Sequence, residues 1–167
     1  MGAEMKNRPD IIVIHHSAGY DHPVIEDWEG IRTYHKNVRG WRDIGYHYGV
    51  ELVNGKPMIK YGRPPFENGA HAPGYNTRSL GVCMVGDFSD SPPGNESLLV
   101  LLDLIWSLTI AFDIPADRIF GHREIMRPGY TQCPGQAFPL AKIKQWIAST
   151  LSLRHTLKDG VPKRSCL

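Results

Sequence analysis

Among the eight histidines and three cysteines of this sequence, three side chains stand at the end of a predicted strand or in an adjacent loop, where they could bind zinc together. His15 ends an apolar run, His122 follows the short stretch IFG, and Cys133 comes soon afterwards in TQCPG. Imidazole nitrogen and thiolate sulfur are the ligands that zinc prefers, and a catalytic zinc site takes three ligands from the protein. Two histidines and one cysteine would complete such a set.

Spacing alone does not decide between a metal site and an ordinary core. The sequence has neither a CxxC nor an HExxH pattern, and the three candidates lie far apart along the chain. In the alternative interpretation, His15 and its neighbour His16 are interior histidines with satisfied hydrogen bonds, and Cys133 is a small buried apolar residue. Pro134 and Gly135 after the cysteine indicate a loop, which argues against a place in the core.

The pattern of apolar residues predicts the strands that would carry these side chains. Residues 11–15 are β-branched and apolar without alternation, as in a strand that is covered on both faces. Asn54 and Gly55 stand between two strand-like runs, and both tolerate a positive φ, which indicates a β-hairpin. The predicted strands are residues 11–15, 46–53, 56–61, the segment SLGVCMVGDF and residues 117–120.

Three helices are predicted between and after these strands. The first begins near Pro23, which suits a first helical turn, and the second covers residues 96–112 with Asn95 as its cap. The third is amphipathic and ends near residue 153. Residues 62–77 are rich in proline and glycine and predict a long surface loop, where functional residues are often found. The apolar positions at helical spacing are Ile25, Trp28, Ile31 and His35 in the first helix and Leu140, Ile143, Ile147 and Leu151 in the last.

The order of these elements predicts the fold class. Strands interspersed with helices, one hairpin and no internal repeat indicate an α/β fold with a mixed central β-sheet flanked by helices on both sides. A chain of 167 residues fits one such domain. We assign residues 11–153 to this domain, residues 1–10 to an N-terminal extension and residues 154–167 to a polar C-terminal tail.

Composition and charge exclude several classes of protein. With 41% hydrophobic and 22% charged residues, the chain is typical of soluble globular proteins. A net charge of +2 is too small for the basic surface of a nucleic-acid-binding protein, so we expect no nucleic-acid partner. Three cysteines are too few, and odd in number, for a disulfide framework.

Neither a membrane span nor a secretory signal is expected. The most apolar segment, residues 98–112, contains Asp103, Ser107 and Thr109 and is shorter than the roughly 20 residues of a membrane span. We expect a core helix there and no integral membrane association. The N-terminal residues lack the apolar core of a secretory signal, so export by that route is not expected.

The chain resembles a known family in five segments that occur in the family's order: IHHSAG, GWRDIGYHYGVE, GAHAPGYNTRSLGVCMVGDF, GHRE and TQCPGQAF. The family is that of the zinc N-acetylmuramoyl-L-alanine amidases of the peptidoglycan recognition protein type, which includes phage amidase endolysins. The resemblance covers residues 11 to 147 and implies the three-layer fold of that family.

The resemblance implies that His15, His122 and Cys133 bind one zinc ion, with the first histidine of the pair as the ligand. Adjacent side chains on a strand point to opposite faces, which agrees with only one of His15 and His16 facing the metal. Relatives that lack the cysteine are generally binders rather than hydrolases, so Cys133 favours activity.

Two catalytic residues, Tyr46 and Thr131, are also implied by the resemblance. Tyr46 would orient the attacking water and help move a proton to the leaving nitrogen. From the residues alone, a strand aromatic that packs in the core is the more common role for such a tyrosine. Thr131 stands where relatives carry a lysine or a threonine near the scissile carbonyl. Because threonine has no positive charge, stabilisation of the oxyanion would depend on zinc and a neutral hydroxyl.

Several further residues are candidates for substrate contact or for support of the ligands. His71 could instead be a loop histidine bonded to the backbone, and Trp41 could line the cleft or simply pack. Arg123 and Glu124 could orient a ligand imidazole or form an ordinary surface pair. The candidate substrate-binding residues are His71, Tyr75, Asn76 and Trp41.

The reaction that the resemblance implies is zinc-dependent hydrolysis of the amide between N-acetylmuramic acid and L-alanine in peptidoglycan. We expect a monomer that acts on peptidoglycan or muropeptides. The alternatives are a receptor module that binds peptidoglycan without cutting it and a cytosolic amidase that recycles anhydromuropeptides. The recycling branch usually has an aspartate as third ligand, so Cys133 argues against it. A prophage endolysin, made in the cytoplasm and released through a separate membrane pore, agrees with the absence of a signal.

Overall fold

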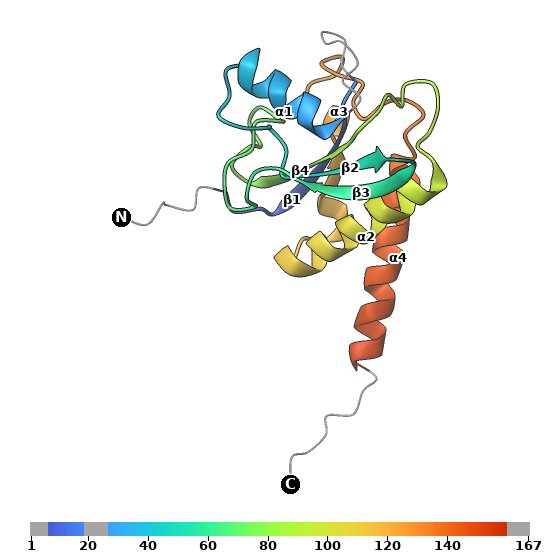
Figure 1. The fold of residues 1–167 in the computed structure, drawn as a ribbon. Coiled ribbons are helices and arrows are strands. Elements are labelled where there is room, and N and C mark those ends of the chain that lie inside the picture. Colours follow the sequence, from blue (N-terminus) through green and yellow to red (C-terminus); the bar gives the residue numbers. More distant parts are fainter. Residues whose placement is uncertain (1–6, 19–26, 160–167) are drawn as a thin grey trace.

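Five strands form a mixed sheet at the centre of the protein (Figure 1). The structure is a computed structural model that describes residues 7–18 and 27–159. The strand order is β3-β2-β4-β1-β5, with β1 parallel to both of its neighbours, β2 parallel to β4, and β3 antiparallel to β2. The strands are β1 (Ile11–His16), β2 (Tyr48–Val53), β3 (Lys56–Tyr61), β4 (Ser79–Met84) and β5 (Ile119–Gly121).

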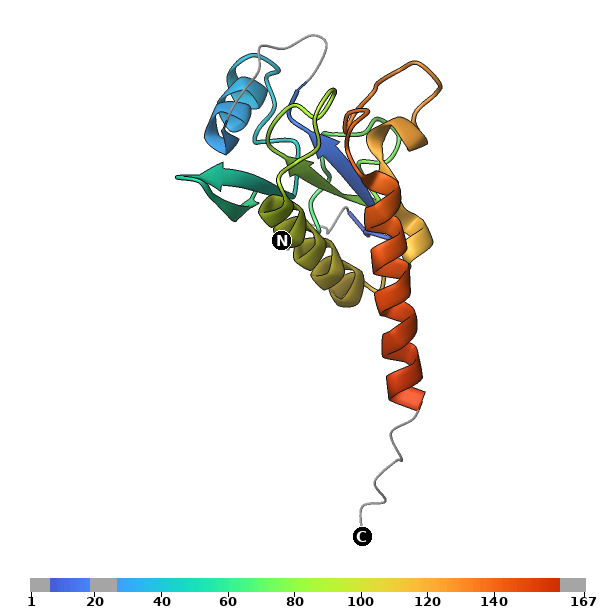
Figure 2. The ribbon, with the colours of Figure 1, turned by 90° about the vertical axis from the view of Figure 1, so that its right-hand side faces the viewer.

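Helices cover both faces of this sheet, as the sequence predicts (Figures 1 and 2). Helices α2 and α4 pack on one face, and α1 lies over the other (Figure 2). The helices are α1 (Trp28–Asn37), α2 (Asn95–Phe112), the 3-10 turn η1 (Ala116–Arg118), α3 (His122–Ile125) and α4 (Leu140–Asp159). The predicted three-layer α/β fold is therefore confirmed.

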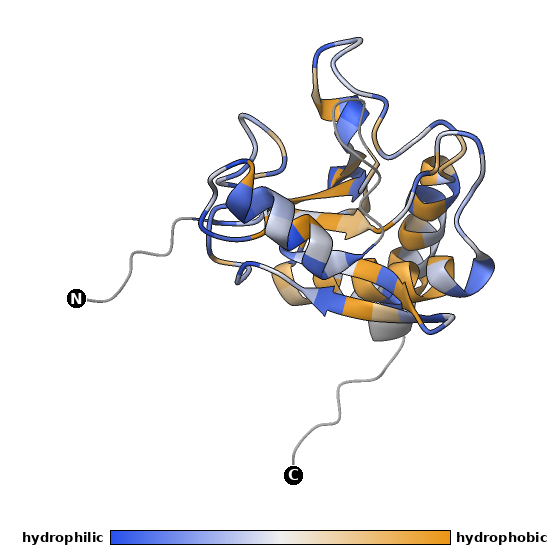
Figure 3. Ribbon diagram, turned by 45° about the horizontal axis from the view of Figure 1, so that its top comes forward, coloured by the Kyte–Doolittle hydropathy of each residue, from blue (hydrophilic) through white to orange (hydrophobic). Residues whose placement is uncertain are grey.

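Strand β1 is buried along its whole length and divides its side chains between the two faces. Ile12 and Ile14 pack in the large core formed with α2 and α4, whereas Ile11 and Val13 pack on the opposite side around Ala72. Burial of each such side chain contributes roughly 1.5–3 kcal/mol. The apolar colouring of the strands and of the inner helix faces follows this arrangement (Figure 3). A strand held on both faces gives His15 and His16 a rigid support.

The boundaries of several elements differ from the predicted ones. Helix α1 begins at Trp28 with Asp27 as its cap, and the predicted start at Pro23, like Ile25, lies outside the described residues. The cap of α2 is Gly94, so the prediction of Asn95 was wrong: Asn95 is already the first helical residue. The strand predicted at residues 117–120 is shifted to 119–121, because these residues pair with Ile12–Ile14 of β1.

Some residues of the predicted N-terminal extension and C-terminal tail belong to the folded structure. Asn7, in the predicted extension, is fully buried, and its side-chain amide donates to the carbonyls of Pro65 and Ser79. Helix α4 continues through residues 154–159 of the predicted tail and projects beyond the rest of the domain (Figure 2). The domain boundaries themselves remain a prediction.

Helix α2 is the apolar helix that the sequence predicts for the core. By length and hydropathy alone it could also cross a membrane. In the structure, Leu101, Leu104, Ile105 and Leu108 form one buried face in the core against the sheet. The helix therefore closes one side of the sheet and leaves the strand ends open.

Candidate metal centre

The carboxyl ends of parallel strands bring together the three predicted zinc ligands. His15 lies near the end of β1, and His122 begins α3 directly after the neighbouring parallel strand β5. Parallel strands end at the same edge of a sheet, which is where ligands bind in open α/β sheets. Cys133 reaches the same edge from the loop after α3. The ligand atoms of His15, His122 and Cys133 all lie within 4.8 Å of one another.

The geometry and chemistry of this group fit zinc. In a tetrahedral site, Zn–N distances of about 2.0–2.1 Å and a Zn–S distance of about 2.3 Å place nitrogen and sulfur about 3.6 Å apart. His15 Nδ1 lies 3.6 Å from Cys133 Sγ. His122 Nε2 is buried and has no hydrogen-bond partner among the described residues, which is costly for a polar atom unless a ligand satisfies it. Two nitrogens and one sulfur thus converge on one point.

Burial keeps the two histidines neutral and ready to bind a cation. It lowers the pKa of His15 well below its ordinary value, and the nearby imidazoles of His122, His71 and His16 act in the same direction. Burial, with a further contribution from His16, lowers the pKa of His122 to about 4. A neutral imidazole has a free lone pair, which is the form that coordinates a metal.

Two hydrogen bonds hold Cys133, one from the end of β1 and one within its own loop. Its sulfur accepts a hydrogen bond from the amide of His16 at 3.4 Å, and its own amide donates to Thr131 Oγ1 at 3.1 Å. Burial raises the pKa of the thiol to about 12, although the His16 amide and the Arg123 guanidinium oppose this rise. The thiol therefore has to lose its proton when it binds a metal.

Arg123 and Glu124 support the loops rather than an imidazole. The Arg123 guanidinium donates to the carbonyls of Gln132 and Gly135, and its amide donates to the carbonyl of Cys133. Glu124 accepts from the Gly121 amide at the start of α3 and pairs with Lys144 of α4. Both residues fix the positions of α3 and the cysteine loop, and neither has a hydrogen bond to His15 or His122 among those of the described residues.

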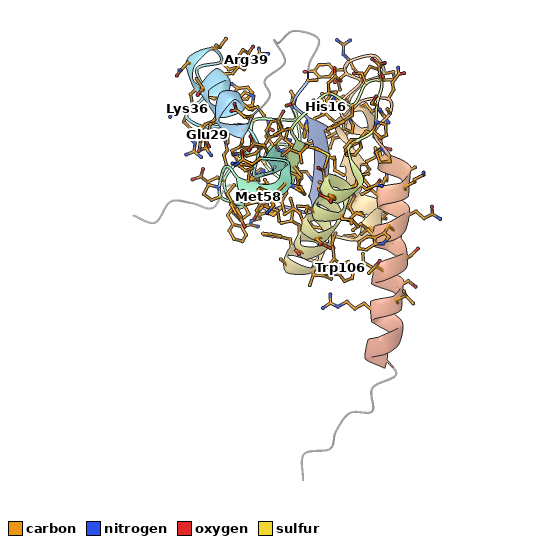
Figure 4. The ribbon with its side chains drawn as sticks, turned by 45° about the vertical axis from the view of Figure 1, so that its right-hand side comes forward. His16, Glu29, Lys36, Arg39, Met58 and Trp106 are labelled. Atoms are coloured by element: carbon orange, nitrogen blue, oxygen red, sulfur yellow. The ribbon has the colours of Figure 1, made fainter. Side chains whose placement is uncertain are left out.

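His16 faces away from the metal position, as strand alternation requires. Its Nδ1 accepts from the Phe88 amide at 3.3 Å and lies 3.9 Å from Asp87. Figure 4 shows it at the end of β1, between the loops at that edge of the sheet. A hollow opens beside it and shares a wall with the metal position. The hollow is lined by His16, Ala18, Asp87, Ser89, Thr131, Gln132 and Cys133.

Tyr46 lies next to His15 but outside the strand in which it is predicted. Strand β2 begins two residues later, at Tyr48, and the Tyr46 ring centroid is 5.1 Å from that of His15. Burial raises the pKa of Tyr46 well above its ordinary value, and the Cys83 and Cys133 thiols contribute in the same direction. The phenol therefore keeps its proton at neutral pH and can act as a donor.

Thr131 lies at the rim of the hollow, two residues before Cys133. Its Oγ1 accepts a hydrogen bond from the Cys133 amide, so its hydroxyl hydrogen is available to another acceptor. This arrangement lets one side chain hold the cysteine loop and also donate toward a molecule in the hollow.

The predicted substrate-binding residues lie at two places around the site. His71, Tyr75 and Asn76 lie in the loop before β4, where Asn76 Oδ1 accepts the amides of His71 and Ala72. Trp41 stacks near His35, with 4.6 Å between ring centroids, and is separated from His15 by His35 and Tyr46. Contact of these residues with substrate remains a prediction.

Three residues around the site are not among the predicted site residues. Ser79 contacts His71, Cys83 packs beside Tyr46, and His35 stacks on both Tyr46 and Trp41. Cys83 stands opposite His15 in the register of β1 and β4, which strand alternation could have suggested. The roles of Ser79 and His35 depend on tertiary contacts that leave no sequence pattern.

Comparison with known proteins agrees with this site. The profile of a family described as N-acetylmuramoyl-L-alanine amidase matches residues 5–136. The chain is 33% identical to peptidoglycan-recognition protein LB of Drosophila melanogaster, over 90% of its own length and 67% of the fly protein. It is 31% identical to the human N-acetylmuramoyl-L-alanine amidase over 81% of its length, but it spans only 23% of that protein.

A solved structure has the same fold. The endolysin N-acetylmuramoyl-L-alanine amidase LysCS of Clostridium intestinale superposes with a TM-score of 0.72 at 28% identity, and the match covers 88% of each chain. The resemblance seen in the five sequence segments is confirmed by these matches. The chain belongs to the N-acetylmuramoyl-L-alanine amidase family.

Proposed function

We propose that this chain is a zinc-dependent N-acetylmuramoyl-L-alanine amidase, which hydrolyses the amide between N-acetylmuramic acid and L-alanine in peptidoglycan. The observation that carries the proposal is the buried group of His15, His122 and Cys133, whose donor atoms lie within 4.8 Å of one another. Family membership supports the substrate class. The cell wall would then be the site of action.

The three ligands define what a bound metal would contribute. Held by His15, His122 and Cys133, zinc would supply Lewis-acid chemistry that polarises the amide carbonyl and makes water nucleophilic near neutral pH. Every other task in the reaction then has to be performed by side chains around the ligands.

Tyr46 is suited to managing the proton on the leaving nitrogen. Amide hydrolysis releases an amine, whose nitrogen needs a proton as the bond breaks. The raised pKa of Tyr46 keeps a proton on its hydroxyl oxygen, and its ring lies against that of His15. We assign Tyr46 the role of donating a hydrogen bond, and then the proton, to the nitrogen of L-alanine.

Thr131 is suited to binding the carbonyl oxygen as negative charge develops on it. Its hydroxyl oxygen accepts a hydrogen bond from the Cys133 amide, so the hydroxyl hydrogen can point into the hollow beside the metal position. A fixed donor aimed at a developing oxyanion stabilises the transition state. Because the hydroxyl is neutral, this contribution is smaller than a lysine would give at the same place.

Analysis of digested peptidoglycan tests the proposal. The purified chain should release new L-alanine N-termini without new reducing ends of the glycan. A strong chelator should stop the reaction, and added zinc should restore it. Cys133→Ser should lose both zinc and cleavage while it keeps the circular dichroism spectrum of the wild type.

Two other outcomes would contradict the proposal. Cleavage by a metal-free sample would refute zinc dependence. Binding of peptidoglycan by zinc-loaded wild type without any cleavage would instead identify a receptor module.

A further inference from the structure

His71 lies behind His15, on the side away from the metal position. Its Nδ1 is 3.0 Å from His15 Nε2, and its Nε2 is 3.2 Å from Ser79 Oγ. His71 is 9% exposed, and both of its ring nitrogens have partners within the protein. An imidazole in this state has no donor or acceptor left for a substrate.

The hydrogen bonds of this group can run in only one direction. Ser79 Oγ lies 2.7 Å from the carbonyl oxygen of Tyr75, which can only accept, so the hydroxyl hydrogen is donated there. Ser79 Oγ then accepts from His71, whose hydrogen must sit on Nε2. His71 Nδ1 is left with a lone pair and accepts from His15 Nε2.

This direction determines which nitrogen of His15 is free. With its hydrogen on Nε2, the neutral His15 ring has its lone pair on Nδ1, the atom that lies 3.6 Å from Cys133 Sγ. The opposite tautomer would place a hydrogen on Nδ1 and block coordination there. The chain of bonds from Tyr75 to His15 thus selects the tautomer that can bind zinc.

The packing around His71 holds its ring in the required orientation. A Cβ atom at Gly69 would lie 2.5 Å from His71 Cδ2, and a Cβ at Gly81 would lie 2.5 Å from the same atom. Only glycine at these two positions therefore leaves room for the ring in this orientation. Asn76 holds the backbone amide of His71 through its Oδ1.

We infer that His71 is a positioning residue for the zinc ligand His15, which it holds in the Nε2–H tautomer with Nδ1 directed at the metal, rather than a substrate-binding residue. The inference rests on the proposed zinc site. It assigns Ser79 and the Tyr75 carbonyl to the same task, because they fix the direction in which His71 accepts.

Zinc affinity measured by competition with a chromophoric chelator tests the inference. His71→Leu removes the acceptor for His15 and should weaken zinc binding about 10–100-fold, as is typical for the partner of a ligating histidine. His71→Asn places an amide oxygen near the position of Nδ1 and should recover most of the loss. Ser79→Ala, a milder change, should weaken binding less than His71→Leu does.

His47→Leu is the matched control. His47 is buried, and its ring lies 5.7 Å from that of His71, but its nitrogens contact the Gly81 amide and the Glu67 carbonyl. The His47→Leu substitution should leave zinc affinity unchanged even if it lowers the stability of the fold. Unchanged affinity in folded His71→Leu, or equal losses in the His71 and His47 variants, would overturn the inference.

Nuclear magnetic resonance of the metal-free chain separates this inference from the proposed function. Long-range proton–nitrogen correlations should show the His15 hydrogen on Nε2 in the wild type and a mixture of tautomers in Ser79→Ala and His71→Leu. A hydrogen on Nδ1 in the wild type would overturn the inference whether or not zinc binds. Failure of the wild type to bind zinc, with the Nε2–H tautomer present, would refute the proposed function alone.

Discussion

Zinc binding to this site should release one proton per chain, even in mildly acidic solution. At pH 6 His15 and His122 are neutral and have no proton to lose. Burial lowers the pKa of His15 well below its ordinary value and lowers the pKa of His122 to about 4. Cys133, with its pKa raised to about 12, is fully protonated and must release its proton to bind.

Ordinary side chains would behave differently. Two histidines with a pKa of about 6.5 would each be about three-quarters protonated at pH 6, and the cysteine would be protonated as well, so about 2.5 protons would leave. The structure thus predicts that about 1 proton is released per zinc ion bound, whereas groups with unperturbed pKa values would release about 2.5 protons. Since one proton competes with the metal, zinc affinity should rise about tenfold per pH unit between pH 5 and pH 8.

Isothermal titration calorimetry measures this number directly. Zinc is titrated into the metal-free chain at pH 6 in several buffers that differ in ionisation enthalpy. The slope of the observed heat against that enthalpy gives the number of protons released. A slope near 2.5 would refute the conclusion that the fold holds both imidazoles neutral, and a slope near zero would mean that Cys133 does not bind as a thiolate.

Three other changes have defined expected outcomes. Burial lowers the pKa of His47 to about 4, so below pH 6.5 the unfolded chain binds a proton at this position that the folded chain does not. His47 should therefore lower the free energy of unfolding of the metal-free chain by about 3 kcal/mol as the pH falls from 6.5 to 4, in addition to the same effect of the other buried histidines, and urea denaturation of His47→Gln should show a pH dependence smaller than that of the wild type by this amount. Tyr46→Phe should keep its zinc and lose turnover about 10²–10⁴-fold, and unchanged turnover would remove Tyr46 from the mechanism. Gly49→Ala would place a Cβ 2.2 Å from Trp28 Cζ3, so chemical denaturation should show a loss of about 1–3 kcal/mol, and a variant as stable as the wild type would contradict the packing of α1 on the sheet.

Elements with strong local patterns could be predicted from the sequence. The β-branched run before His15 identifies a buried strand, and Asn54-Gly55 identifies the turn between β2 and β3, where both residues have positive φ. Strand alternation explains why only one histidine of the pair faces the metal position. The three ligands are ordinary in spacing, and their grouping followed from the family resemblance and not from the residues alone.

What depends on tertiary contacts could not be predicted. The resemblance suggested substrate contact for His71, but its two hydrogen bonds join residues from β1 and β4 that are distant in the chain. The shift of β5 from the predicted residues 117–120 to 119–121 is set by its pairing with β1, which no local propensity encodes. The exposed charged residues Glu29 and Lys36 of α1 follow the helix pattern but, like Arg39 just after the helix, carry no information about the site (Figure 4).

X-ray absorption at the zinc edge tests the central claim most directly. The zinc-loaded chain should hold one ion per molecule, with one sulfur ligand at about 2.3 Å and nitrogen or oxygen ligands at about 2.0–2.1 Å. The sulfur contribution should disappear in Cys133→Ser. A spectrum without sulfur in the wild type, or a chain that retains no zinc after dialysis, would contradict a metal centre formed by His15, His122 and Cys133.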